Sequence, residues 1–168
     1  REAGGTVLQE NVDFTPVGRL GVFEDPQGAV FCAWEAGDRE GAELVNEPGA
    51  WSMGALQTDD TDAAARFYGE VFGWQTEAFG PATMFRLPGY FGGEASQPVP
   101  RDVVAVMVPA PPDTKPGWAV DFWIDDVERA VEVVQRLGGS VLAGPYDAPP
   151  AFTQAVVTDP GGAVLSLS

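Results

Sequence analysis

The sequence predicts an α+β fold in which paired βαβββ modules form a cupped, mixed sheet, preceded by part of another such module. Three observations support this fold class. Strand-like segments alternate with two segments of helical periodicity, short sequences recur at fixed spacings, and loops rich in proline and glycine separate the strand candidates. At 168 residues, 45% of them hydrophobic, the chain can bury a substantial core.

A repeat relates the first residues of the chain to its last ones. Gly4-Gly5-Thr6-Val7-Leu8 recurs as Gly138-Gly139-Ser140-Val141-Leu142, and Asp25-Pro26-Gln27-Gly28-Ala29-Val30-Phe31 recurs as Asp159-Pro160-Gly161-Gly162-Ala163-Val164-Leu165. Both pairs keep one offset of 134 residues without an insertion, which chance matches do not usually do. We therefore interpret the chain as beginning within a domain, with three parts: the C-terminal part of a first domain (1–37), a linker (38–48) and a complete second domain (49–168).

Residues 49–112 are predicted to form the first module of the complete domain. A strand is expected over Trp51–Gln57, and the acidic segment Thr58–Asp62 supplies a cap for a helix that ends at Gly73. Two strand candidates follow, Phe79–Leu87 and Val103–Val108. Aromatic residues at helical spacing are expected in the core: Phe67, Tyr68, Phe72 and Trp74.

Residues 113–168 repeat this order as the second module, at a spacing of 66 residues. A strand over Trp118–Ile124 leads into Asp125-Asp126, which caps a helix over Val127–Leu137. Three short strand candidates complete the module: Ser140–Leu142, Gln154–Thr158 and Ala163–Leu167.

Charge and composition exclude several classes of function. With 9 basic and 25 acidic residues the net charge is −16, so binding to nucleic acids or to anionic membrane surfaces is not expected. The chain has no histidine, which excludes Ser-His-Asp catalysis and every histidine metal site. No apolar run is long enough for a membrane helix. The single cysteine, Cys32, cannot form an internal disulfide; it is expected to be a buried thiol in a cytoplasmic protein.

Several motifs in this order resemble a known superfamily. They are the first strand with its Asp-Asp helix entry, the aromatic residues from Phe67-Tyr68 to Phe72-Gly73-Trp74, and the terminal Asp159-Pro160-x-Gly162 hairpin. The chain resembles the vicinal oxygen chelate superfamily, which includes glyoxalase I, extradiol dioxygenases and bleomycin-resistance proteins. Gly18–Val22 and Gly41–Gly49 are similar to its tandem-domain actinobacterial branch, whose members are labelled glyoxalase-like proteins or hydroxylases. The resemblance covers nearly the whole chain, on a scaffold that hosts many chemistries.

The resemblance also implies where metal ligands would lie, on the first and last strands of each module. Counting back seven residues from Asp60 and Asp126 gives Met53 and Ala119, and the last-strand position falls on Ser166. These side chains cannot provide the histidine and carboxylate ligands that Fe(II), Zn(II) or Ni(II) require. We therefore expect no metal and no cofactor.

The alternation of side chains along the first strand of each module predicts which residues line the cup of the sheet. The candidates are Met53, Ala55, Gln57, Ala119, Asp121 and Trp123, while Val120, Phe122 and Ile124 would pack under the helices. Asp121 stands out because a charge within an apolar strand is costly unless it is paired or hydrated. It is a candidate for binding a ligand or acting as a base, or else it pairs with Arg86 or another strand cation at the sheet rim. Trp123 is either an aromatic wall for a planar ligand or part of the core, and Ser166 and Ser168 would line the cup.

Two functions follow from these observations. The first is binding of a small organic molecule in the cup without a catalytic metal, as in bleomycin-resistance proteins, through Met53, Asp121, Trp123 and Ser166. The alternative is a glyoxalase-like lyase, hydroxylase or dioxygenase-related enzyme for a small oxygenated metabolite, with Asp121 as its ionisable group. As protein partners we expect either a second copy in a homodimer or the rest of the first domain.

Overall fold

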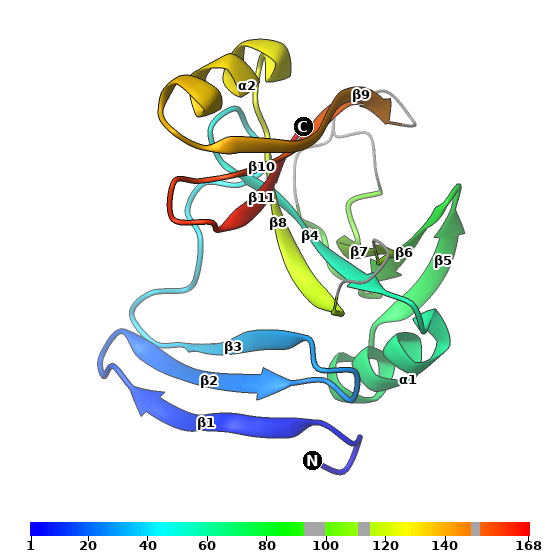
Figure 1. Cartoon of the computed structure of the whole chain (residues 1–168). Coiled ribbons are helices and arrows are strands. Elements are labelled where there is room, and N and C mark those ends of the chain that lie inside the picture. Colours follow the sequence, from blue (N-terminus) through cyan, green and yellow to red (C-terminus); the bar gives the residue numbers. More distant parts are fainter. Residues whose placement is uncertain (93–99, 111–114, 149–151) are drawn as a thin grey trace.

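The computed structural model describes residues 1–92, 100–110, 115–148 and 152–168, which form two β-sheets and two α-helices (Figure 1). In chain order the elements are β1 (Thr6–Asp13), β2 (Gly18–Glu24), β3 (Val30–Ala36), β4 (Trp51–Thr58), α1 (Thr61–Phe72), β5 (Gln75–Phe79), β6 (Ala82–Arg86), β7 (Val103–Pro109), β8 (Gly117–Phe122), α2 (Val127–Arg136), β9 (Ser140–Ala148), β10 (Phe152–Thr158) and β11 (Val164–Leu167). The predicted α+β fold class with paired βαβββ modules is confirmed.

The larger sheet joins the two modules edge to edge. Its strand order is β5-β6-β7-β4-β8-β11-β10-β9, so the first strand of each module lies at the centre. β4 and β8 pair antiparallel to each other, and each pairs parallel to the last strand of its own module. The two modules therefore share one continuous sheet, and each of its faces runs across both modules.

Two strand predictions differ from the structure. The single strand predicted over Phe79–Leu87 is wrong, because β5 and β6 form a hairpin that turns at Gly80, whose φ of 57° suits glycine. β9 extends to Ala148, well beyond the predicted Ser140–Leu142. The module boundary predicted between residues 112 and 113 lies outside the described residues.

The acidic segments before both helices act as caps, as predicted. The side chain of Asp60 accepts a hydrogen bond from the backbone of Ala63 at 2.9 Å, and Asp126 accepts one from Arg129 at 2.9 Å. α1 ends at Gly73, which adopts the left-handed conformation that closes a helix (φ 72°).

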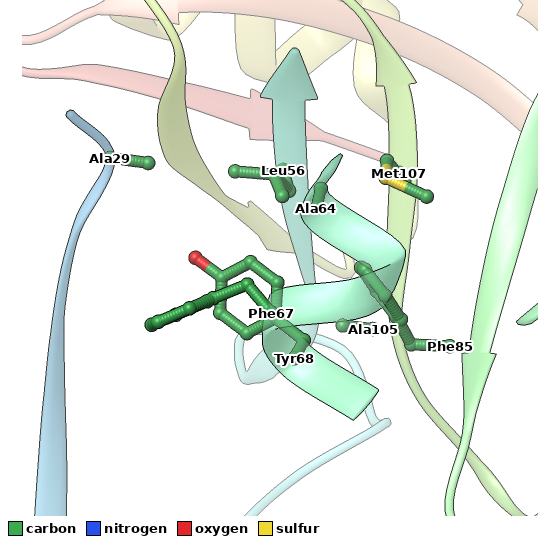
Figure 2. Packing of buried hydrophobic residues seen from close by; sticks show 8 residues of the cluster. All are labelled: Ala29, Leu56, Ala64, Phe67, Tyr68, Phe85, Ala105 and Met107. Atoms are coloured by element: carbon green, nitrogen blue, oxygen red, sulfur yellow. The ribbon is translucent and has the colours of Figure 1, made fainter. Parts of the chain in front are cut away.

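One hydrophobic cluster lies between α1 and the sheet (Figure 2). Its buried members are Ala29, Leu56, Ala64, Phe67, Tyr68, Phe85, Ala105 and Met107. Tyr68 is fully buried and touches six other aromatic rings: Phe31, Phe67, Phe72, Trp74, Phe85 and Trp118. The aromatic residues predicted for the core are therefore placed correctly.

A second, smaller cluster lies beneath α2. Val127 and Val131 of the helix pack on three strand residues, Ala155, Val157 and Leu167. Both helices thus cover the same face of the sheet, and the opposite face forms the inside of the cup.

The three-stranded sheet β1-β2-β3 has the same local structure as β9-β10-β11. Its strands pair antiparallel in the same order, and the Asp25–Ala29 turn has the backbone hydrogen bonds of the Asp159–Ala163 turn. Asp25 is buried, and its Oδ2 accepts a hydrogen bond from the Tyr68 hydroxyl at 3.0 Å. This sheet therefore packs against α1, whereas its assignment to a first domain remains a prediction.

Cys32 on β3 is exposed, so the expectation of a buried thiol is wrong. Phe31 and Ala33 line a groove beside α1, and alternation therefore turns Cys32 to the opposite face of the small sheet.

Candidate functional site

Strand register determines which side chains lie in the cup. Leu56 on β4 pairs with Trp118 on β8, and both pack toward α1. The intervening positions of the two strands therefore face the cup, and Asp121 is among them. Phe122 and Ile124 pack beneath α2 as predicted, but Val120 is 40% exposed, so its predicted burial is wrong.

Three of the predicted ligand-binding residues are neighbours across adjacent strands. Asp121 pairs with Met53 of β4 on one side and with Ser166 of β11 on the other. Residues that pair directly place their side chains on the same face of a sheet. Met53, Asp121 and Ser166 therefore form one row across the centre of the cup.

Trp123 follows the end of β8 and is held through its backbone. Its amide donates to the carbonyl of Ala50 at 3.0 Å, and its carbonyl accepts from Gly49 at 2.8 Å. The side chain is half-buried and belongs to neither hydrophobic cluster among the described residues. Its role as an aromatic wall for a ligand stays a prediction.

Asp121 is 7% exposed and is the centre of a small polar cluster. Ser52 donates its hydroxyl hydrogen to Oδ2 at 2.5 Å, and Ser168 donates to the same oxygen. The other oxygen, Oδ1, is buried and receives no hydrogen bond from any described residue. One half of the carboxylate is thus satisfied and the other is not.

Burial raises the pKa of Asp121 above its usual value, because the charged form loses its water. The hydroxyl groups of Ser168 and Ser52 and the side chain of Gln154 oppose this rise, since they favour the carboxylate. A carboxyl group whose pKa is raised by burial is a candidate for a functional site.

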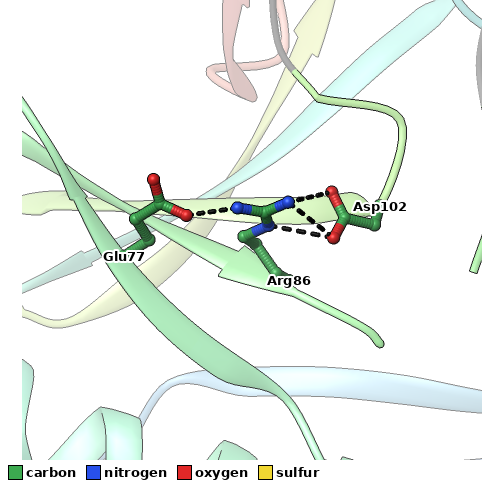
Figure 3. A network of polar contacts seen from close by, with 3 residues as sticks. All are labelled: Glu77, Arg86 and Asp102. Atoms are coloured by element: carbon green, nitrogen blue, oxygen red, sulfur yellow. Dashed lines mark hydrogen bonds and ion pairs between the residues drawn. The ribbon is translucent and has the colours of Figure 1, made fainter. Parts of the chain in front are cut away.

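Arg86 does not pair with Asp121, so that alternative is wrong. Its guanidinium group binds both oxygens of Asp102, with Nε and Nη2 at 2.9 Å, and also contacts Glu77 (Figure 3). These three residues link β5, β6 and the segment before β7. Arg86 therefore pairs with Glu77 and Asp102 within the first module.

The side chains at the positions predicted for metal ligands do not fit a transition metal. Met53 offers a thioether, Ala119 a methyl group and Ser166 a hydroxyl, whereas transition metals in such sites need imidazole and carboxylate ligands. Within the described ranges, no group of three cysteine, aspartate or glutamate side chains could hold a metal ion. We therefore derive no chemistry through a metal.

An apolar groove of about 190 Å³ lies elsewhere, between the three-stranded sheet and α1. Its walls include Val7, Phe23, Phe31 and Ala33, which the 134-residue repeat equates with Val141, Val157, Leu165 and Leu167. In the second module those four residues belong to the cluster that α2 covers. The groove therefore has the character of a helix-packing face, and Asp121 is the stronger candidate for a ligand site.

Sequence reasoning missed Ser52 and Gln154. Simple alternation turns Ser52 away from Met53, but a register shift between Trp51 and Met53 brings its hydroxyl to Asp121. Gln154 lies on β10 and accepts a hydrogen bond from Tyr146 at 3.1 Å. Its amide side chain, next to the apolar run Ala155–Val157 of the same strand, was the available signal.

Comparison with known proteins places the chain in a family. A family model described as a glyoxalase-like domain matches residues 53–168. Over 98% of its length the chain is 33% identical to "Putative glyoxylase CFP32" from Mycobacterium tuberculosis and 34% identical to "Anthracycline biosynthesis protein DnrV" from Streptomyces peucetius. The chain spans 60% of the first of these relatives and 58% of the second.

Solved structures agree with the fold. The Mn(II)-bound glyoxalase from Novosphingobium aromaticivorans matches 99% of this chain and 55% of its own, with a TM-score of 0.60 and 19% identity. The 2,3-dioxygenase LapB from Pseudomonas sp. KL28 matches 99% of this chain and 63% of its own, also with a TM-score of 0.60, at 15% identity. At these identities the likeness concerns the fold alone. Neither helix in the described part of the chain is long and apolar enough to cross a bilayer.

Proposed function

The chain belongs to the glyoxalase-like domain family, and on that premise we propose that it binds a small organic molecule with a planar aromatic part in the cup of the sheet, without a catalytic metal. The observation that carries this proposal is Asp121, a buried carboxylate with one unsatisfied oxygen at the centre of the cup. Binding proteins need only a few polar groups to orient a ligand within an otherwise apolar pocket.

The surroundings of Asp121 support binding more than catalysis. The neighbours in its row, Met53 and Ser166, are a flexible apolar side chain and a neutral hydroxyl. Neither is a general acid or base, and the chain has no histidine that could share proton transfer. The relatives named for anthracycline biosynthesis suggest a polycyclic aromatic compound as the first ligand to test.

The alternative is an enzyme of the glyoxalase, hydroxylase or dioxygenase-related type. Family membership favours it, since the match to the glyoxalase-like domain covers most of the chain. In that case Asp121, with its raised pKa, would be the proton-transferring group. The two functions differ in whether an added compound is recovered unchanged after incubation with the protein.

Substitution of Asp121 by asparagine tests the binding proposal. We expect Asp121→Asn to weaken binding of the anthracycline daunorubicin by more than tenfold, which is more than about 1.4 kcal/mol, because a charge-assisted hydrogen bond is lost while the shape is kept. Fluorescence titration of daunorubicin measures the affinity, and thermal unfolding of the same samples measures stability.

The matched control is Asp147→Asn, which removes the same charge from an exposed position on β9. It should leave daunorubicin affinity unchanged. Unchanged binding in Asp121→Asn together with a lower melting temperature would assign Asp121 a structural role only. Absence of daunorubicin binding in the unaltered chain would remove anthracyclines as ligands.

Metal content provides a separate prediction. We expect the purified chain to retain less than stoichiometric Zn, Fe, Mn or Ni after gel filtration, because the side chains at the superfamily's ligand positions are poor donors for these ions. Elemental analysis by mass spectrometry measures this directly. One tightly held transition metal per chain would contradict the metal-free proposal and favour the enzymatic alternative.

A further inference from the structure

The carboxylate of Asp121 is satisfied at only one of its two oxygens. Oδ2 accepts hydrogen bonds from Ser52 and Ser168, whereas Oδ1 is buried and receives none from the described residues. A buried carboxylate loses its hydration, so it needs both a complete set of hydrogen bonds and an opposite charge nearby. Asp121 therefore lacks a donor at Oδ1.

Among the described residues, no positively charged side chain pairs with Asp121 either. Asp121 takes part in none of the ion pairs within the described part of the chain, which are Arg1–Glu10, Arg19–Glu35, and Arg86 with Glu77 and Asp102. The described groups that reach Asp121 are Ser52 on β4, Gln154 on β10 and Ser168 directly after β11, and their side chains are all uncharged. The net charge of −16 also favours cations over anions near the protein.

The side chain of Gln154 lies beside Asp121 and could rotate away from it. Its carbonyl oxygen accepts from the Tyr146 hydroxyl, which leaves the amide nitrogen for the carboxylate, although no hydrogen bond to Oδ1 is completed. Tyr146 is 44% exposed and Gln154 is half-buried, so this pair lies between solvent and the carboxylate. Rotation of one glutamine side chain between staggered conformers would uncover Oδ1 without moving the backbone.

We propose that the ligand in the cup binds Asp121 through a protonated amine, which displaces the Gln154 amide and forms an ion pair with Oδ1. An ammonium group is compact and carries three donors, so it satisfies the free oxygen and neutralises the charge together. A neutral hydroxyl group would supply the hydrogen bond but leave the carboxylate uncompensated. This inference rests on the proposed function, because it concerns the same site.

Two small probes of matched shape test this inference on the full chain. We expect benzylammonium chloride to cause saturable shifts in the NMR signals of the Ser52, Asp121 and Ser168 backbone amides. Benzyl alcohol should bind at least about tenfold more weakly, because it has no charge. Asp121→Asn should remove this preference, and the exposed control Asp147→Asn should retain it.

Gln154→Ala separates displacement from direct contact. If the amide only covers Oδ1, this variant should bind benzylammonium as tightly as the unaltered chain or more tightly. A tenfold or greater loss of benzylammonium affinity would mean that Gln154 itself contacts the ligand. That result would contradict the proposal that the ligand displaces the Gln154 amide.

The outcomes also distinguish this inference from the proposed function. Equal binding of the two probes, or binding of neither, would contradict the proposal that the ligand binds Asp121 through a protonated amine. The effect of Asp121→Asn on daunorubicin binding would still decide whether the cup is the ligand site.

Discussion

Tyr68→Ala is expected to lower the free energy of unfolding by about 4 kcal/mol, within the range for removal of a large buried aromatic side chain. Tyr68 is fully buried on the sheet-facing side of α1, in contact with six aromatic rings, so the neighbouring residues can fill the resulting cavity only in part. Single domains are stable by only about 5–15 kcal/mol, so this loss is a large fraction of the total. Urea unfolding followed by tryptophan fluorescence measures the change.

Tyr68→Phe isolates the contribution of the hydroxyl group. The hydroxyl accepts a hydrogen bond from Trp118 Nε1 at 2.9 Å and donates one to Asp25 at 3.0 Å. Its removal leaves the half-buried Trp118 donor and the buried Asp25 carboxylate without this partner, at a cost of about 1–3 kcal/mol. Tyr90, which is 44% exposed, provides the control, and Tyr90→Phe should be nearly neutral. A loss below about 1 kcal/mol in Tyr68→Ala would contradict the role of this cluster as the main core.

The fold was predictable because its signals are local and repeated. Acidic caps and apolar residues at helical spacing depend on neighbouring residues, and the 134-residue repeat is visible by direct comparison of two segments. The structure agrees with these signals at Asp60, Asp126 and the two Asp-Pro turns. The β5–β6 hairpin was missed because Gly80-Pro81, read within a longer apolar segment, did not mark a turn by itself.

The candidate site was predictable only in part, since it depends on how distant strands align. Alternation correctly placed Asp121 with Met53 and Ser166 across three strands. It also placed Ser168 in the cup, where its hydroxyl donates to Asp121, but it could not supply Ser52, which lies at a register shift. Arg86 was expected as a partner from charge alone, and Glu77 and Asp102 lie closer to it.

Gly139→Ala is the second substitution with a large expected effect. Gly139 joins the end of α2 to β9, and its amide donates to the carbonyl of Val134 at 2.9 Å. A β-carbon built there would lie 2.3 Å from the carbonyl oxygen of Thr158 and 2.7 Å from Val134 Cγ1. Because the first of these atoms belongs to the backbone of β10, either the strand or the helix must move. We expect a loss of about 3 kcal/mol, at the upper end for overpacking.

Gly117→Ala is the matched control, because the nearest atom to its added β-carbon is the Lys115 carbonyl oxygen at 4.0 Å. It should change stability by less than about 0.5 kcal/mol. Equal effects of the two substitutions in chemical denaturation would contradict the close approach of α2 to β10.

The comparison also bears on the ligand site, since β10 carries Gln154. If Gly139→Ala displaces that strand without unfolding the chain, the preference for benzylammonium over benzyl alcohol should change, whereas Gly117→Ala should leave it intact.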